Sequence, residues 1–215
     1  MSLPFSIDQF LDVFRLYNEA VWPAQTILVI LAVSAVLAAY SQRFTRAPAG
    51  ILALLWLWMG AVYHFGFFRS INPAATLFAA LFIIQAGVFA WYAFVRRTLA
   101  FERPRDRVHL AGLALIAFAL LGYPLAGWFA GHRYPAAPTF GLPCPTTIFT
   151  FGLLLLARRP LPRAVFVIPV LWSIIATTAT VQLGMVEDFT LLPAAVIATG
   201  LAFRRARREG ELRLA

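Results

Sequence analysis

Long apolar runs alternate with short polar segments along almost the whole chain, a pattern typical of a polytopic membrane protein. A hydrophobic stretch of about 18 residues or more can cross a bilayer as a helix. Seven apolar segments that approach or exceed this length follow one another, the fifth interrupted by prolines. We therefore expect an all-α fold, with a bundle of seven transmembrane helices over residues 22–203, at about 22–40, 49–68, 74–95, 108–130, 138–157, 164–183 and 189–203.

Residues 1–21 have a different pattern, in which apolar and charged positions recur with the period of a helix. Ser6 and Gln9 have the spacing of a capping box. We expect an amphipathic helix that lies in the headgroup region on the outer surface. Its apolar positions are Ile7, Phe10, Leu11, Phe14, Tyr17 and Val21, and its charged positions are Asp8, Asp12, Arg15 and Glu19.

The arginines are distributed unevenly between the two expected ends of the bundle. The loops after the first, third and fifth runs, together with the C-terminal segment, contain 15 of the 18 arginines. Short loops rich in arginine stay in the cytoplasm. We therefore expect the N-terminus outside, the C-terminus inside, and residues 204–215 as a basic cytoplasmic tail near lipid headgroups.

Composition narrows the classes of function. The 215 residues are 61% hydrophobic and only 13% charged, whereas a soluble domain has about 25% charged residues. The net charge of +9 would suit nucleic acid, but the arginine positions are those of a topology signal, so no nucleic-acid partner is expected. The absence of lysine excludes a lysine Schiff base, and the single cysteine excludes an internal disulfide.

The fifth run begins with the least helical stretch of the chain, residues 138–148, where Cys144 stands between Pro143 and Pro145. Proline lacks an N–H group and disfavours helical geometry in the residue before it. In one interpretation Pro145 is the first helical residue and Cys144 is the N-cap. The span is then broken near Pro143 and Pro145, and a helix N-terminus with four unpaired N–H groups opens below the outer surface.

Two threonines, Thr146 and Thr147, would add hydroxyl groups to this first helical turn. A helix over 145–159 would span only about 22 Å, which is less than the apolar thickness of about 30 Å. In the alternative interpretation, Pro138 starts the helix and Cys144 is a small apolar residue in a kinked span.

Other polar residues gather at the same, outer end. His64 and Tyr63 are close to the outer end of the second run, and Asn72 is in the turn that follows. Glu187 and Asp188 begin the seventh run, where acids favour a helix N-terminus. Tyr63 and His64 also suit the membrane interface as anchors. We expect an outward-facing substrate-binding pocket formed by Cys144, Thr146, Thr147, Tyr63, His64 and Asn72.

Catalytic and metal-binding chemistry centres on the single cysteine. Cys144 could combine with His64 or His132 and with Glu187 as a Cys–His–acid group, because all four are expected at the outer end. Cys144, His64 and His132 are weak candidate ligands for a soft metal ion such as Cu(I) or Hg(II). No other cofactor is expected, and no enzyme motif occurs in the sequence.

Three segments resemble an uncharacterised family of bacterial seven-helix integral membrane proteins, classified only as a domain of unknown function. They are residues 17–23 (YNEAVWP), residues 55–74 (from LWLWMG through YH to INPA) and residues 144–152 (CPTTIFTFG). The resemblance covers nearly the whole chain. It implies a multi-pass protein of the bacterial inner membrane, and it carries neither an activity nor functional residues.

The leading functional hypothesis is a small transporter or channel-like protein that takes a small ion or small molecule at this pocket. One alternative is a membrane enzyme or soft-metal-binding protein that uses Cys144. The other is a non-catalytic subunit that binds a partner protein or a second copy of the chain within the lipid bilayer.

Overall fold

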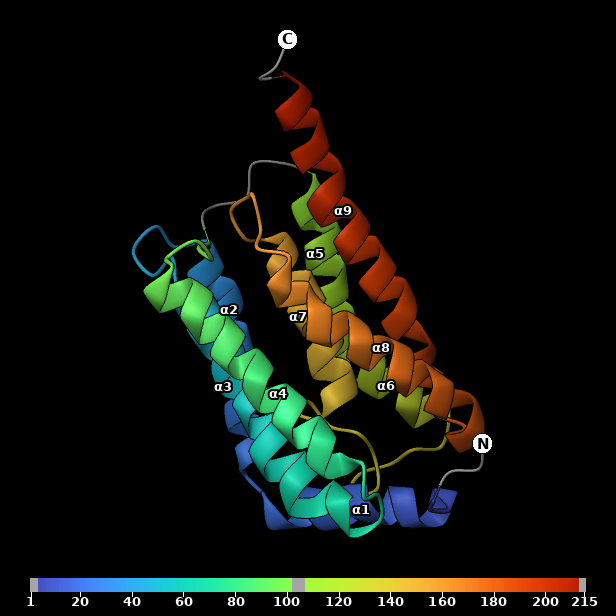
Figure 1. Ribbon diagram of the computed structural model, residues 1–215. Coiled ribbons are helices and arrows are strands. Elements are labelled where there is room, and N and C mark those ends of the chain that lie inside the picture. The colour runs from blue at the N-terminus through green and yellow to red at the C-terminus, as the bar shows by residue number, and fades with distance from the viewer. Residues whose placement is uncertain (1–3, 102–106, 213–215) are drawn as a thin grey trace.

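The computed structural model describes residues 4–101 and 107–212, with all side chains in these ranges except those of Ala179 and residues 204–212. This part of the chain consists of helices and loops, with two isolated β-bridges and no β-strand. Helical rods run side by side between two ends of the molecule, and one helix lies across one end (Figure 1). The predicted all-α class is confirmed.

The crossing helix, α1 (Ile7–Ala20), turns by 85° into α2 (Ala24–Ala39). Three later rods contain a π-helical turn (η1, η3 or η4), and η2 and η5 are 3-10 turns. The remaining elements are α3 (Ala47–Trp58) with η1 (Met59–Phe67) and η2 (Phe68–Ser70), α4 (Ala75–Ala90) with η3 (Trp91–Val95), α5 (Val108–Ala117) with η4 (Phe118–Gly122) and α6 (Tyr123–Phe129), α7 (Pro143–Leu155), α8 (Ala164–Leu183), and η5 (Val186–Thr190) with α9 (Leu191–Leu212).

Five rods are long and apolar enough to cross a membrane, judged by length and composition. The bent pair α1–α2 passes the same test only as one unit, and α7 is a short apolar helix of 13 residues. Several apolar helices of this length are consistent with a membrane location. The five long rods are Ala47–Ser70, Ala75–Val95, Val108–Phe129, Ala164–Leu183 and Val186–Phe203.

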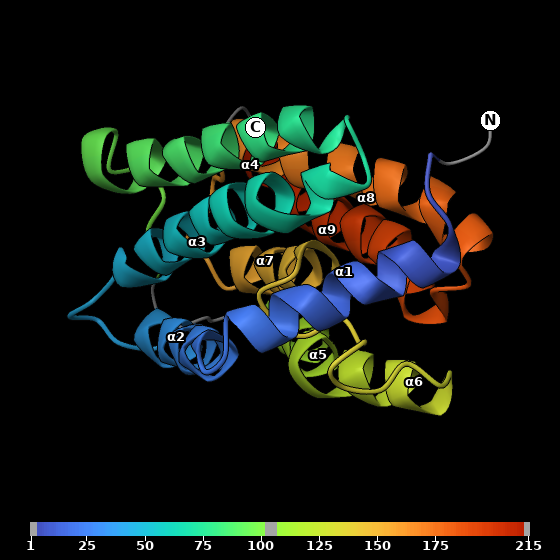
Figure 2. The same cartoon turned by 90° about the horizontal axis from the view of Figure 1, so that it is seen from below.

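α7 lies at the centre of the bundle. Its side chains are buried along the whole helix, apart from that of Cys144, which is half-buried. The helices α3, α5, α8 and α9 pack around it, and it is central when the molecule is seen from the α1 end (Figure 2). Because protein surrounds α7, nonhelical backbone next to it finds polar partners without contact with lipid.

Two glycines bring α5 and α7 into close contact. A Cβ atom on Gly112 would lie 2.7 Å from the carbonyl oxygen of Gly152, and a Cβ on Gly152 would lie 2.7 Å from the carbonyl oxygen of Gly112. Small residues allow such an approach of two backbones, which is common between membrane helices.

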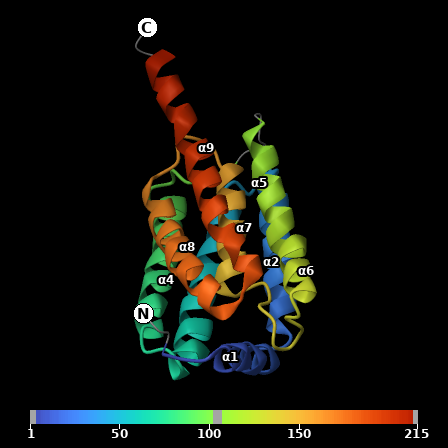
Figure 3. The same ribbon diagram turned by 90° about the vertical axis from the view of Figure 1, so that its right-hand side faces the viewer.

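α1 has the predicted amphipathic character and runs across the end of the bundle (Figures 1 and 3). The predicted capping box is confirmed, because the Gln9 N–H donates to Ser6 Oγ at 3.2 Å and the Ser6 N–H donates to Gln9 Oε1 at 2.9 Å. Phe14 and Tyr17 are buried beneath the helix, while Asp12 is exposed. Of the expected apolar positions, Ile7 is exposed.

The arginine-rich segments lie at the opposite end from α1. Residues 40–46, 96–101 and 156–163 connect rods there, and α9 projects from the same end (Figure 1). The Phe101 N–H donates to the Thr45 carbonyl at 2.7 Å, and the Arg158 N–H donates to the Ala100 carbonyl at 2.8 Å. The charge asymmetry of the sequence is therefore also an asymmetry between the two ends of the molecule.

Candidate functional site: a cavity at the start of α7

α7 begins at Pro143, so both expected starting points, Pro145 and Pro138, are wrong. Leu142 is the N-cap, with φ −84° and ψ 158°, and Cys144 is the second helical residue. Proline is well suited to a first helical position, and Pro145 two residues later is tolerated because its missing N–H would have no intrahelical acceptor. The expectation of a short helix preceded by nonhelical backbone agrees with this geometry.

The first turn of α7 has fewer free N–H groups than the four that we expected. Pro143 and Pro145 have none, and the Leu142 N–H donates to the Thr139 carbonyl at 3.1 Å. Of the four N-terminal positions, Cys144 alone keeps an N–H for another acceptor. The start of α7 is therefore a poor site for an anion.

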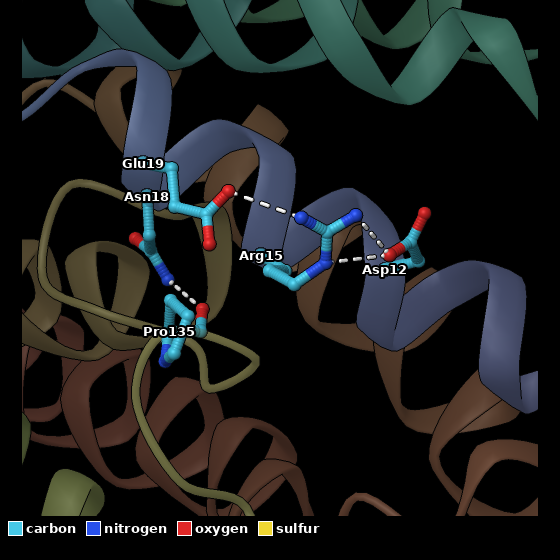
Figure 4. Close-up of polar contacts among 5 residues, drawn as sticks. All are labelled: Asp12, Arg15, Asn18, Glu19 and Pro135. Atoms are coloured by element: carbon cyan, nitrogen blue, oxygen red, sulfur yellow. Dashed lines mark hydrogen bonds and ion pairs between the residues drawn. The ribbon is translucent and has the colours of Figure 1, made fainter.

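Asn18 of α1 holds the nonhelical segment in front of α7. Its Nδ2 donates to the carbonyl oxygens of Pro135 at 2.7 Å and Ala137 at 2.8 Å. Figure 4 shows the Asn18 side chain directed toward Pro135, apart from the exposed pairs that Arg15 makes on the same helix. This buried amide positions the residues that lead into α7.

Further contacts within the segment satisfy its backbone. The Thr139 hydroxyl donates to Asn18 Oδ1 at 2.7 Å, and the Gly141 N–H donates to Thr146 Oγ1 at 3.1 Å. Gly141 has a φ of +98°, a conformation that glycine adopts readily. Nonhelical backbone is stable inside the bundle because the surrounding protein supplies these hydrogen-bond partners.

A cavity of about 150 Å³ lies in front of the α7 start, between α1 and the bundle. Most of its lining is apolar, with eight aromatic rings and a few polar side chains. The lining consists of Phe5, Phe10, Phe14, Tyr63, Phe68, Asn72, Phe78, Tyr123, Pro138, Leu142, Pro143, Cys144, Pro145, Trp172, Ile175, Ala176, Thr178, Thr180, Leu183 and Asp188.

Among the described residues that line the cavity, Asp188 is the only acid, and it is 6% exposed. The Tyr123 hydroxyl donates a short hydrogen bond to Asp188 Oδ1, and the Cys144 thiol lies beside the same carboxyl group. The indole of Trp172 also lines the cavity; its buried Nε1 lies beside the Cys144 sulfur, which is a weak acceptor, and has no stronger acceptor in the described part of the chain. Four elements, α6, α7, α8 and η5, thus bring four polar side chains to one place.

Glu187, next to Asp188, has a separate partner. Glu187 Oε1 and His132 Nδ1 are 2.9 Å apart, and the Glu187 side chain is fully buried. Gly127 of α6 makes room for this carboxylate, because a Cβ there would lie 3.1 Å from Glu187 Oε1. The pair joins the linker before α7 to η5 and lies outside the cavity lining.

The structure brings together three of the six predicted site residues. Cys144, Tyr63 and Asn72 line the cavity. Asn72 Oδ1 also accepts the Ala74 N–H at 3.0 Å and so stabilises the turn before α4.

Thr146 and Thr147 are not among the lining residues. Both are fully buried; Thr146 supports Gly141, and the Thr147 hydroxyl has no hydrogen-bond partner. Neither side chain therefore faces the cavity as we expected.

His64 lies behind the cavity wall in a cage of aromatic rings. Its ring centroid is 4.6 Å from that of Phe82 and 5.2 Å from those of Tyr63 and Trp172. It is fully buried, and neither ring nitrogen has a hydrogen-bond partner. His64 thus supports the Trp172 indole from behind.

The three weak metal candidates do not meet. Cys144 lies beside Asp188, His132 contacts Glu187, and His64 is enclosed by rings. Among the residues that the structure describes, no group of three or more His, Cys, Asp or Glu side chains is arranged to hold a metal ion.

A second cavity, of about 480 Å³, lies on the other side of Tyr123. Tyr123, Pro138 and Pro145 line both cavities. The second cavity is bordered by Val29 of α2 and Trp128 of α6. The Tyr123 ring therefore stands between the two spaces.

Tyr17 fixes α1 above the cavity. Its hydroxyl accepts the Trp58 Nε1–H at 2.8 Å, and its ring makes an edge contact with Tyr63 at 5.5 Å. Burial raises the pKa of Tyr17 to about 12, because the charged phenolate would lose its hydration. The buried, neutral Tyr17 side chain therefore anchors α1 to the bundle.

Sequence reasoning missed the contribution of Asp188, Tyr123 and Trp172. Asp188 was interpreted as a helix-capping acid, and Tyr123 and Trp172 as parts of apolar runs. The sequence contains only a weak signal for this site. Asp188 is an acid at the edge of an apolar run, and Tyr123 stands before Pro124 within another apolar run. Their meeting depends on helices that are far apart in sequence.

Comparison with known proteins identifies a family for this chain but no activity. Neither the search of curated proteins nor the search of solved structures gave a match. A family profile described as "Family of unknown function (DUF6064)" matches residues 7–213, which is nearly the whole chain. This agrees with the resemblance found in the sequence. The chain belongs to this DUF6064 family of unknown function.

Proposed function

We propose that the protein spans the bacterial inner membrane seven times, with the N-terminus outside and the C-terminus in the cytoplasm, and transports a small solute. In this arrangement α1 lies on the outer surface, α2 and α7 are the two short spans, and the arginine-rich end faces the cytoplasm. The cavity beside α7 then opens toward the outer side.

One observation carries the transport proposal: a mainly apolar cavity beside the start of a short central helix contains a single buried acid. Acids within a membrane bundle are costly and mark solute or proton pathways. Short or interrupted helices near the centre of a bundle form binding sites in many transporters.

A carrier suits the packing better than an open channel. Below Cys144 the side chains of α7 are buried along the helix, and the rings of His64 and Phe82 are packed behind the Trp172 ring that lines the cavity. A solute that reaches Asp188 can proceed inward only if these elements move, as in alternating access.

The surroundings of Cys144 do not favour a nucleophilic cysteine. Reactive thiolates form in electropositive sites, next to basic side chains or free helix N-termini. The Cys144 thiol instead lies beside the carboxyl group of Asp188, and the prolines remove most N–H groups from the helix start. We therefore assign Cys144 to the wall of the binding site.

Uptake by proteoliposomes tests the transport proposal. The assay uses a panel of radiolabelled small aromatic cations, neutral compounds and anions, with empty liposomes as the blank. We expect accumulation of at least one compound, and a loss of about tenfold or more in its rate for Asp188→Asn. Asp12→Asn, which changes an exposed acid on α1, is the matched control and should retain uptake. If uptake of every compound equals that of empty liposomes, the transport proposal is wrong.

A further inference from the structure

Among the side chains that the structure describes, no cationic group forms an ion pair with the Asp188 carboxyl group. Arg15 pairs with Asp12 and Glu19, and His132 pairs with Glu187. A buried carboxylate is stable only when an opposite charge or several hydrogen bonds compensate it. The Tyr123 hydroxyl and the Cys144 thiol, which is a weak donor, supply hydrogen bonds to Asp188. Both donors are neutral, so the carboxylate charge must be neutralised by a proton or by a bound cation.

The other charged groups near the cavity do not provide that compensation. Glu187 and His132 contact each other, so the His132 imidazole is engaged by Glu187 and forms no ion pair with Asp188. The Pro143 and Pro145 rings remove the N–H groups through which the α7 N-terminus would attract an anion. The electrostatic preference of the cavity is therefore for a positive charge.

The aromatic lining supports the same preference. Tyr63, Phe68, Phe78 and Trp172 contribute ring surfaces to the cavity. The face of an aromatic ring attracts a cation, most strongly where water is excluded. The Trp172 Nε1–H, which has only the weakly accepting Cys144 sulfur beside it among the described residues, offers a separate hydrogen bond to a polar atom of the ligand.

The volume limits the size of the ligand. The cavity measures about 150 Å³, and an apolar protein cavity of about that volume holds one benzene molecule. A ligand with one aromatic ring, or an aliphatic group of equal volume, fills this space. Larger polycyclic cations do not fit without movement of α1.

We propose that the cavity binds a small organic monocation, with one aromatic ring or an equivalent apolar group, whose charged nitrogen pairs with the Asp188 carboxylate between aromatic rings. This proposal rests on the proposed transport function, because it names the class of solute that the carrier would take. The ligand enters from the outer side, beneath α1, and displaces the proton or water that otherwise accompanies Asp188.

Equilibrium binding to the full-length protein in lipid nanodiscs tests the charge preference. Three probes share one phenyl ring and differ in charge: benzylammonium, benzyl alcohol and benzoate. By titration calorimetry near neutral pH, we expect benzylammonium to bind at least about tenfold more tightly than benzyl alcohol, and benzoate to bind most weakly.

Two variants test whether the Asp188 carboxylate causes the preference for a cationic ligand. Asp188→Asn keeps the shape of the side chain and an acceptor for the Tyr123 hydroxyl, and it should weaken benzylammonium binding by about 30-fold or more while changing benzyl alcohol binding little. Glu187→Gln removes the adjacent acid, which lies outside the cavity lining, and should leave the preference for the cation unchanged.

The inference is overturned by any of three results: equal affinity for the three probes, strongest binding of benzoate, or no binding of benzylammonium. Unchanged benzylammonium affinity in Asp188→Asn also overturns it. The comparison of probes on the wild-type protein decides the charge preference even if a variant does not fold. Binding of benzylammonium together with no uptake of any compound in the proteoliposome panel would refute the transport function and leave the cation site standing.

Discussion

At the residue scale, the site depends on buried polar side chains whose partners are distant in sequence. Asn18 contacts Pro135 and Ala137 across more than one hundred residues. Trp56 Nε1 donates to Thr150 Oγ1 at 3.0 Å between α3 and α7. A buried polar group without its partner is destabilising, so each of these contacts selects one arrangement of the helices around α7.

Tyr17 gives a pH-dependent prediction at this scale. Its folded-state pKa is raised to about 12 from the usual tyrosine value of 10.0, so its stabilising effect is complete below the unfolded pKa and is lost as the pH rises toward the folded value. Between about pH 8 and pH 11, this ionisation should lower the free energy of unfolding of the wild-type protein by about 1.4 kcal/mol. Tyr17 belongs to α1, outside the proposed spans.

Tyr17→Phe removes this ionisation and leaves the Trp58 N–H without its acceptor. Near pH 8 the variant should be less stable than the wild type by about 1–2 kcal/mol, and this deficit should shrink by about 1.4 kcal/mol near pH 11. Denaturant unfolding of the detergent-solubilised protein at both pH values measures the two differences. A deficit that is the same at both values would show that Tyr17 does not titrate as expected.

At the element scale, α5 packs closely against α7, the helix whose first residues line the cavity. The two backbones meet at Gly112 and Gly152, where a Cβ on either residue would lie 2.7 Å from the opposite carbonyl oxygen. Backbone atoms cannot move aside as the end of a flexible side chain can. The close contact therefore permits only glycine at these two positions.

Gly152→Ala should separate the two helices and lower stability by about 1–3 kcal/mol, as expected for overpacking. Gly87→Ala is the control, because Gly87 of α4 has open space where a Cβ would be, and alanine favours a helix by about 1 kcal/mol over glycine. Thermal unfolding in detergent should give a lower midpoint for the first variant and an equal or higher midpoint for the second. The opposite order would contradict the close α5–α7 contact.

The π-helical turns are a second feature at this scale. Tyr63 and His64 belong to η1, and Tyr123 directly follows η4. An extra residue in one turn rotates the side chains that follow it relative to a regular α-helix, and such turns are frequent at functional sites. These turns help to determine which of the aromatic residues in an apolar run face the cavity.

At the scale of the whole molecule, the two ends differ in charge, and one of them is covered by a helix that lies across the bundle (Figure 1). One end has α1 and the cavity beneath it, and the other has the arginine-rich segments. In the proposed orientation the first end is outside the cell.

Labelling of single cysteines in intact cells tests this orientation. In a Cys144→Ala background, Ser70→Cys places a thiol on an exposed residue at the α1 end, and Gln42→Cys places one on an exposed residue at the other end. A membrane-impermeant maleimide should label the first variant in intact cells and the second only after the membrane is permeabilised. Labelling of Gln42→Cys alone in intact cells would reverse the orientation.

Much of the fold could be predicted from local patterns. The apolar runs predict where the helical rods lie, Ser6 and Gln9 predict the start of α1, and the prolines at 143 and 145 predict a short helix. These features depend on side chains near one another in sequence, and their physical causes act within one or two helical turns.

The start of α7 and half of the predicted pocket could not be predicted in this way. Pro143, Pro145 and Pro138 are all suited to a helix start, and contacts with α1 favour the first of them. Thr146 and Thr147 follow Cys144 in sequence, but a helix turns by about 100° per residue, so their side chains face neighbouring helices and not the cavity.

The sequence by itself determined the helical class, the apolar segments, the amphipathic first helix and the charge difference between the two ends, because each follows from local periodicity and composition. The tertiary structure alone decided that Asp188 meets Tyr123 and Cys144 beside an aromatic cavity. The reason is physical: lateral packing of the helices is set by close contacts such as that of Gly112 with Gly152, and no local pattern specifies which faces of distant helices will meet.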